Sequence, residues 1–216
     1  MRQPDPLRQP ECGCTAHCCV DPSDSQTLAT ARRRLRGALL WWRDFLRTKP
    51  ERREASGGRS DSMPDSVLYT DAEGNGQVGF VLIEASSGRG WFVEGRVPSH
   101  WRRSLMARKT QINLYELIAV LGAVRSFAEV LRGHRVVAFV DNQAALNMII
   151  KGASSKEDAN AIVHQVWLEL AELGTHMQWE YVASKANIAD GPSRGRLQEV
   201  EMLGLERANI QWGEIQ

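Results

Sequence analysis

Two aspartates stand at positions where a protein could assemble a metal site. Asp71 follows the short strand-like run at residues 67–70, and Asp141 follows the continuous apolar run at residues 136–140. In open α/β sheets, ligands bind beyond the carboxyl ends of the strands, so the two carboxylates meet if their strands are adjacent and parallel. Each aspartate taken singly has an ordinary alternative, since an Asp after a strand often caps a helix or forms a turn.

A third acid, Glu116, lies in a segment, residues 109–131, whose apolar residues recur at helical spacing. At that spacing it shares a face with Val120 and Phe127, which indicates that its side chain is at least partly buried. Charged side chains are rarely buried fully unless they are paired or bind a metal. A glutamate pointing inward from this helix could reach the same strand ends. The alternative is a residue at the core boundary whose carboxylate extends into solvent.

Close carboxylates favour a divalent cation between them. Two such groups repel each other by roughly 1 to 4 kcal/mol at about 4 Å, depending on the effective dielectric. Several together are stable only when protonated or neutralised, and Mg²⁺ neutralises them well because it prefers carboxylate oxygen. Two ions about 3.5 to 4 Å apart form the clamp used for phosphoryl displacement. The three acids therefore predict metal-assisted hydrolysis.

The elements that must position these acids follow from the hydrophobic pattern after residue 65. Apolar runs at 67–70, 78–83 and 91–97, separated by turn-forming residues, predict a three-stranded meander. The run at 136–140 is typical of a strand buried on both faces. Helices are predicted over 109–131, 143–150 and 156–173, and a fifth strand over 177–182. This order predicts an α/β domain over 66–194, with a mixed sheet flanked by helices, and a C-terminal extension over 195–216.

The first 65 residues differ in character from the rest. Residues 1–24 show no periodicity and are predicted to be disordered, residues 25–53 to form a basic amphipathic helix, and the Gly-, Ser- and Pro-bearing segment that follows to be a linker. Ten Lys or Arg against three acids between residues 32 and 59 could attract phosphates or form a solvated helix face. A cysteine cluster beside His17 lacks the usual zinc spacing, which favours a reduced tail. Its members are Cys12, Cys14, Cys18 and Cys19.

The composition sets only broad limits on function. The 216 residues carry a formal net charge of +1, so the overall charge does not indicate nucleic-acid binding. No segment approaches the ~18 consecutive apolar residues of a membrane span, and the N-terminus lacks the apolar core of a signal peptide. A soluble intracellular protein without membrane association is the default expectation, and nuclear and cytoplasmic locations are not distinguished.

Four segments between residues 69 and 194 resemble the ribonuclease H domain of retroelement reverse transcriptases, and they occur in the same order. The resemblance is closest to the tyrosine-recombinase retrotransposons of the DIRS and Ngaro groups. Those retrotransposons have a similar Asp-Asn pair at the start of a helix, a Lys-Gly-x-x-Ser loop like residues 151–155, and an Ala-Asp-x-x-Ser-Arg sequence at the end of the domain. The segments are Tyr69-Thr70-Asp71-Ala72, Tyr115-Glu116-Leu117-Ile118-Ala119, Val140-Asp141-Asn142-Gln143-Ala144-Ala145 and Asn187-Ile188-Ala189-Asp190-Gly191-Pro192-Ser193-Arg194.

The resemblance implies a ribonuclease H-like fold with five strands in the order 3-2-1-4-5, and a site for two Mg²⁺ ions, or Mn²⁺ in their place. It adds Asp190 to the three acids, with Asp71 bridging both ions, Glu116 and Asp141 on one ion and Asp190 on the other. The implied activity is endonucleolytic cleavage of the RNA strand of an RNA–DNA hybrid, recognised by its 2′-hydroxyl. The residues expected at the substrate are Ala72, Glu73, Gly74, Asn142, Ser193 and Arg194, the last of which could instead form a structural salt bridge.

The sequence also departs from the family pattern. Many ribonucleases H carry a histidine in the loop before the last carboxylate, and residues 183–187 contain none. Residues 39–46 resemble the segment that joins polymerase to ribonuclease H, which makes a reverse transcriptase polymerase domain an expected partner. A non-catalytic nucleic-acid-binding or scaffold remnant of the same fold is the main alternative. An exonuclease with the Asp-x-Glu pattern of residues 71–73 is another, although residues 185–189 hold neither the His nor the Tyr it needs.

Overall fold

The structure, a computed structural model, describes residues 22–48 and 63–213. The chain divides into two units, Met1–Leu40 and Trp41–Gln216. Helix α1 (Pro22–Arg47) is continuous and begins at Pro22 rather than at residue 25. The cysteine cluster and most of the expected linker lie outside the described residues. Within the described ranges, no helix is long and apolar enough to cross a membrane.

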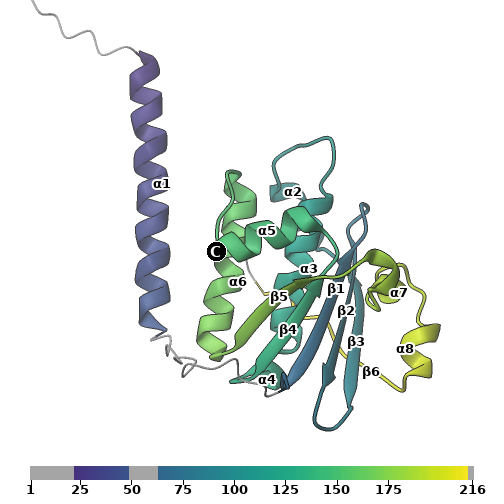
Figure 1. The fold of residues 1–216 in the computed structure, drawn as a ribbon. Coiled ribbons are helices and arrows are strands. Elements are labelled where there is room, and N and C mark those ends of the chain that lie inside the picture. The colour runs from purple at the N-terminus through teal and green to yellow at the C-terminus, as the bar shows by residue number, and fades with distance from the viewer. Residues whose placement is uncertain (1–21, 49–62, 214–216) are drawn as a thin grey trace, which may run out of the picture. The chain divides into compact units, whose positions relative to one another are not determined.

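The second unit is built on a six-stranded sheet with the strand order β5-β4-β1-β2-β3-β6 (Figure 1). The five longer strands follow the expected order 3-2-1-4-5, so the prediction of a ribonuclease H-like α/β fold is confirmed. The sixth strand was not predicted, because a two-residue strand leaves no periodic pattern. The strands are β1 (Ser66–Ala72), β2 (Gln77–Glu84), β3 (Gly90–Arg96), β4 (Arg135–Val140), β5 (His176–Tyr181) and β6 (Glu206–Arg207).

The sheet is antiparallel through the β1–β2–β3 meander and parallel where β4 joins β1 and β5 joins β4. In the β1–β4 ladder, Thr70 pairs with Val140. Each of these residues immediately precedes an aspartate. The register therefore places Asp71 and Asp141 side by side at the carboxyl ends of adjacent parallel strands.

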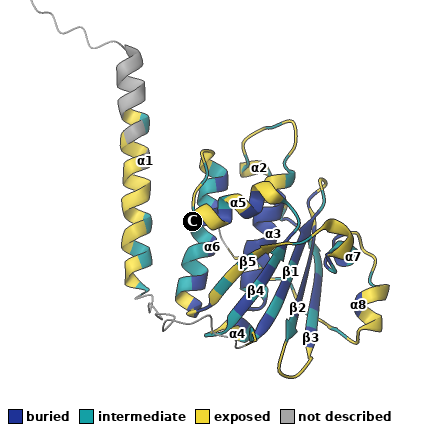
Figure 2. Cartoon of the chain, in the orientation of Figure 1, coloured by how far each residue is buried: buried dark blue, intermediate teal, exposed yellow. Residues whose placement is uncertain are grey.

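Helices cover both faces of the sheet. On one face, α3 packs with α5 and α6 over the larger core, and Figure 2 shows α3 buried along most of its length. On the other face, α7 and α8 cover a smaller core that includes Val81 and Phe92. The expected helix over 109–131 is divided at Phe127 into α3 and α4. The helices are α2 (Ser99–Ser104), α3 (Ile112–Ser126), α4 (Ala128–Leu131), α5 (Gln143–Lys151), α6 (Glu157–Leu173), α7 (Asp190–Ser193) and α8 (Gln198–Met202).

The C-terminal strap, residues 205–213, lies along the outer edge of β3 and then reaches α3. It forms β6, which pairs in parallel with β3. Beyond β6, the Trp212 ring packs edge-on against Phe80 at 6.5 Å and Trp101 at 5.3 Å, measured between ring centroids. A Cβ on Gly122 would lie 2.9 Å from both Phe80 and Trp212, so the glycine permits the close approach of these rings to α3. The strap thus packs on the same core as the sheet.

Candidate active site

Asp71, Glu116 and Asp141 converge at the carboxyl ends of β1 and β4. Their carboxylates offer ligand atoms that all lie within 4.8 Å of one another. Asp71 is 4% exposed and Glu116 is 3% exposed, so Glu116 does not extend into solvent as the alternative had it. Asn142, not Asp141, caps α5, with its Oδ1 accepting from the backbone N–H groups of Ala144 and Ala145. Helix capping therefore does not account for Asp141.

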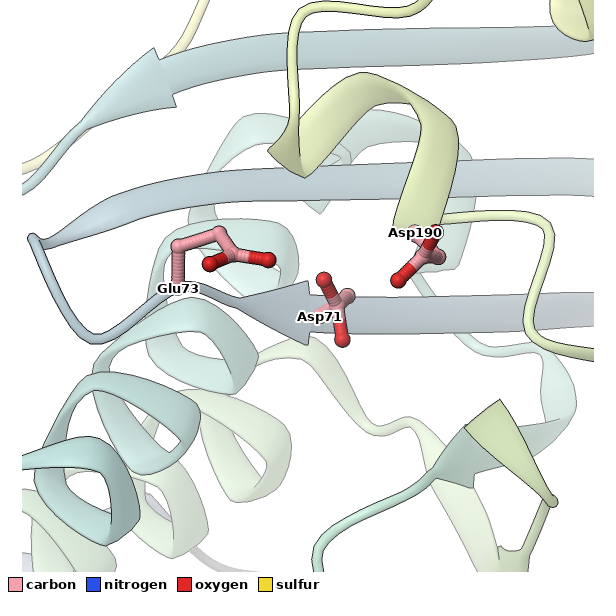
Figure 3. A group of neighbouring side chains, drawn as sticks. All are labelled: Asp71, Glu73 and Asp190. Carbon is pink, nitrogen blue, oxygen red and sulfur yellow. The ribbon is translucent and has the colours of Figure 1, made fainter. Parts of the chain in front are cut away.

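Asp190 reaches the same region from the start of α7, on the opposite face of the sheet from α3. Its carboxylate forms a second group with those of Asp71 and Glu73, again with ligand atoms within 4.8 Å of one another. Figure 3 shows Asp71 on β1, Glu73 just past its end and Asp190 on α7, with their carboxyl groups turned toward one another. Glu73 was expected at the substrate, and its place among the carboxylates was not predicted. Asp71 belongs to both groups, which makes it the shared residue of the site.

Two contacts fix α7 against β1 and β2. Ser193 Oγ donates a hydrogen bond to Asp71 Oδ2. Gly79, which pairs with Asp71 across the β1–β2 ladder, lies directly under α7. A Cβ at Gly79 would be 2.5 Å from the Ala189 carbonyl oxygen and 2.9 Å from Pro192 Cβ. The glycine thus permits the close approach that brings Asp190 and Ser193 to the strand.

The electrostatics of the site favour protonated carboxyl groups when no cation is bound. Burial raises the pKa of Glu116 to about 9, and the nearby charges of Asp141 and Asp71 add to the effect. Burial also raises the pKa of Asp71 to about 7, while the hydrogen bond from Ser193 opposes the rise. Desolvation and like charges both disfavour the ionised form. A cation bound here would reverse this balance by stabilising the ionised groups.

Two arginines lie over Asp190. Arg194 Nε is 2.7 Å from Asp190 Oδ1, and Arg194 Nη2 is 2.9 Å from Glu73 Oε1. Arg196 donates to the other oxygen of Asp190. The expected alternative for Arg194, a structural salt bridge, is therefore present in this structure. Arg196 was not predicted, because ion pairs between surface side chains leave no pattern in the sequence.

The remaining residues expected at the substrate lie around the carboxylates. The backbone of Ala72 hydrogen-bonds to Glu116. Gly74 is in the exposed turn between β1 and β2. The Asn142 amide donates to Asn113 Oδ1 at 3.0 Å. The loop before Asp190 contains a short 3₁₀ turn, Ser184–Ala186.

A pocket of about 610 Å³ opens between the start of α3, α5 and the loop that leads into α6. Three basic residues line it, Arg108, Lys151 and Lys156, together with the side chains of Thr110 and Asn113. Arg108 is held there by Asp158, with Nη2 2.5 Å from Oδ1. Asn113 connects the pocket to the carboxylate end of the sheet through its hydrogen bond with Asn142. The pocket therefore offers basic and hydrogen-bonding groups beside the acidic site.

Comparison with known proteins finds similarity only among solved structures, since no protein-family model and no curated protein matches the chain. One similar structure is the N-terminal RNase H domain of a Mycobacterium tuberculosis protein, solved as a fusion with maltose-binding protein. It is 14% identical, with a TM-score of 0.44, and the match covers 66% of this chain and 99% of that one. Another is RNase H1 from the halophilic archaeon Halobacterium salinarum NRC-1, which is 16% identical, with a TM-score of 0.42 and coverage of 63% and 98%.

Proposed function

We propose that this chain is an endonuclease that hydrolyses the RNA strand of RNA–DNA hybrids, with two Mg²⁺ ions bound by Asp71, Glu116, Asp141 and Asp190. The observation that carries the proposal is Glu116 Oε2, which is enclosed and has no hydrogen-bond partner among the described residues. An unpartnered buried polar atom costs about 1 to 3 kcal/mol. A hard cation that prefers carboxylate oxygen would relieve this cost, so the donor set fits Mg²⁺ or Mn²⁺.

The chain's own residues prepare the site for such ions. Asp71 lies in both carboxylate groups, so it is the residue able to bridge two ions. Ser193 holds one of its oxygens, which restricts the rotation of the carboxylate. The bound ions would supply charge neutralisation at the scissile phosphate and a water activated at neutral pH. The buried position of Asp71 and Glu116 strengthens these electrostatic effects, because the local dielectric is low.

The surroundings support a nucleic-acid substrate. The pocket lined by Arg108, Lys151 and Lys156 could accept phosphates of the DNA strand, and counterion release on phosphate binding is the main source of such affinity. Two further arginines, Arg102 and Arg103, lie on α2. The Asn142 amide and the backbone at residues 72–74 are proposed to read the RNA strand, since its 2′-hydroxyl both donates and accepts hydrogen bonds.

The retroelement resemblance leads to a finer proposal, that the chain belongs to, or derives from, a reverse transcriptase with a separate polymerase domain. Its support is the four ordered segments described above. A non-catalytic nucleic-acid-binding remnant of the same fold is the second candidate. Arg194 and Arg196 favour it, because their pairing with Asp190 already neutralises one of the four acids.

The test is incubation of the purified chain with a strand-labelled RNA–DNA hybrid and Mg²⁺, with an EDTA control. The Asp71→Asn and Glu116→Gln variants remove one charge each from the site. Glu129→Gln is the matched control, because Glu129 is an exposed glutamate on α4. Cleavage of the RNA strand alone is expected for the chain and for Glu129→Gln, with loss in EDTA and in both site variants. A folded chain that cleaves nothing with Mg²⁺ or Mn²⁺, yet retains hybrid binding, would establish the second candidate instead.

A further inference from the structure

We infer that Glu73 is an additional ligand of the ion held by Asp71 and Asp190, and that Arg194 competes with that ion for Glu73. The inference rests on the proposed function and adds one carboxylate to its metal site. We call the ion held by Asp71 and Asp190 the second ion. It would then be bound by three carboxylates on one side of the sheet. Glu116 and Asp141 would remain with the other ion.

The backbone fixes Glu73 where a ligand is needed. Asp71 and Glu73 are two residues apart at the end of β1, and side chains two apart in extended backbone point to the same face. That face is the one α7 covers, which carries Asp190. Two hydrogen bonds of 2.8 Å hold Glu73 in the turn: its N–H donates to the Gln77 carbonyl, and its own carbonyl accepts from Gly76. The backbone that carries this carboxylate is therefore held by hydrogen bonds within the turn.

A cation already bridges Glu73 and Asp190 in this structure. The guanidinium of Arg194 contacts Glu73 at 2.9 Å and Asp190 at 2.7 Å. One positive group thus occupies the place between two carboxylates whose ligand atoms also lie within 4.8 Å of Asp71. We take Arg194 as the residue that compensates these charges until an ion binds.

Displacing Arg194 costs little. Its side chain is 49% exposed, and exposed ion pairs contribute about 0 to 1 kcal/mol. The arginine can turn into solvent, whereas Asp71 and the unpartnered oxygen of Glu116 are enclosed and cannot. A divalent ion with three carboxylate ligands therefore has the advantage over a single guanidinium. Glu73 gives the second ion a ligand set as acidic as that of the first.

The experiment measures Mn²⁺ binding to the full metal-free chain by electron paramagnetic resonance, which counts ions without requiring cleavage. The variants are Glu73→Gln, Arg194→Gln, the double variant and the control Glu129→Gln, each checked for folding by thermal unfolding. We expect Glu73→Gln to weaken the weaker of two Mn²⁺ sites about tenfold, because ligand charge sets affinity. Arg194→Gln should strengthen that site by up to about fivefold, the equivalent of the lost competing pair.

The double variant separates a ligand from a residue that merely positions Arg194. A ligand loses its contribution in either background, so the effect of Glu73→Gln should persist when residue 194 is Gln. If the effect disappears in that background, or if Glu73→Gln leaves both Mn²⁺ sites unchanged, the inference is wrong while the proposed nuclease site stands. If the unmodified chain binds no Mn²⁺, both the inference and the proposed function fail.

Discussion

The side-chain amide of Asn187 donates a 2.9 Å hydrogen bond to the carbonyl oxygen of Thr70. Its Oδ1 accepts a 3.1 Å hydrogen bond from the backbone N–H of Ala189. Thr70 precedes Asp71, and Ala189 precedes Asp190. One buried side chain therefore ties together the backbones that carry two acids of the site, although these segments are more than a hundred residues apart in the chain.

Asn187→Ala should both weaken metal binding at the site and lower the stability of the fold. The change leaves the Thr70 carbonyl and the Ala189 N–H without their partner in a buried position, which costs about 1 to 3 kcal/mol of stability. Urea unfolding measures the loss, and Mn²⁺ titration should show weaker binding at the ion shared by Asp71 and Asp190. Equal stability of the variant and the parent chain would mean that water replaces the amide.

The metal-free chain should lose stability as the pH rises. Asp71 and Glu116 have pKa values raised to about 7 and about 9, from ordinary values of 3.8 and 4.5. Between the ordinary and the raised values the folded state holds more protons than the unfolded state, so stability falls with increasing pH. The contribution is present in full below about pH 4, and its loss is complete near pH 7 for Asp71 and near pH 9 for Glu116. Unfolding in EDTA at pH 5.5 and pH 8 measures it.

Glu116→Gln should remove much of this pH dependence. At pH 8 without metal the variant is expected to be more stable than the parent chain by on the order of 2 kcal/mol, because it buries no ionisable group there. Added Mg²⁺ should stabilise the parent chain at pH 8 and the variant far less. A variant that is less stable than the parent in EDTA at pH 8 would contradict a cost of burying this carboxyl group.

Gly79→Ala should displace α7. The added methyl group would meet the Ala189 carbonyl and Pro192, and backbone must move to admit it. We expect a loss of about 1 to 3 kcal/mol from overpacking, with weaker Mn²⁺ binding because Ser193 is carried away from Asp71. Gly74→Ala is the control for stability, because a Cβ there meets no described atom within 4 Å. Similar losses in both variants would contradict a specific contact at Gly79.

Trp212→Ala should destabilise the sheet domain although it lies outside the predicted boundary at residue 194. The ring packs against Phe80 and Trp101, and Arg125 donates to the Trp212 carbonyl. Because the ring is only partly buried, we expect a loss of about 2 to 3 kcal/mol. Thermal unfolding measures it, and Met202→Ala is the control, since Met202 is 83% exposed. An unchanged midpoint would show that the strap does not stabilise the domain.

Much of the fold could be predicted because its long elements carry strong hydrophobic periods. The apolar runs of the meander, the apolar run before Asp141 and the helical spacing around Glu116 each indicated an element that the structure contains. Adjacent parallel strands then required Asp71 and Asp141 to meet. Glu116 could be inferred because a charged residue on an apolar helix face has few physical reasons to be there.

The unpredicted parts depend on contacts between distant residues. Strand β6 forms because β3 has an open edge, and nothing within residues 206–207 indicates it. The pair of Arg196 with Asp190 depends on side-chain rotamers at the surface. Gly79 offered a usable signal, since a glycine inside an apolar strand often marks a close approach of other backbone.

The strap follows strands β1 to β5 in the chain, so it is synthesised after them. A growing chain emerges with its N-terminal residues first, so β1 to β5 leave the ribosome before residues 206–207. Until then the outer edge of β3 has unpaired N–H and C=O groups, and such an edge can template pairing with another chain. The nascent protein therefore exposes this edge of β3 until β6 pairs with it, and a ribosome that stalls in this interval would expose the edge for longest.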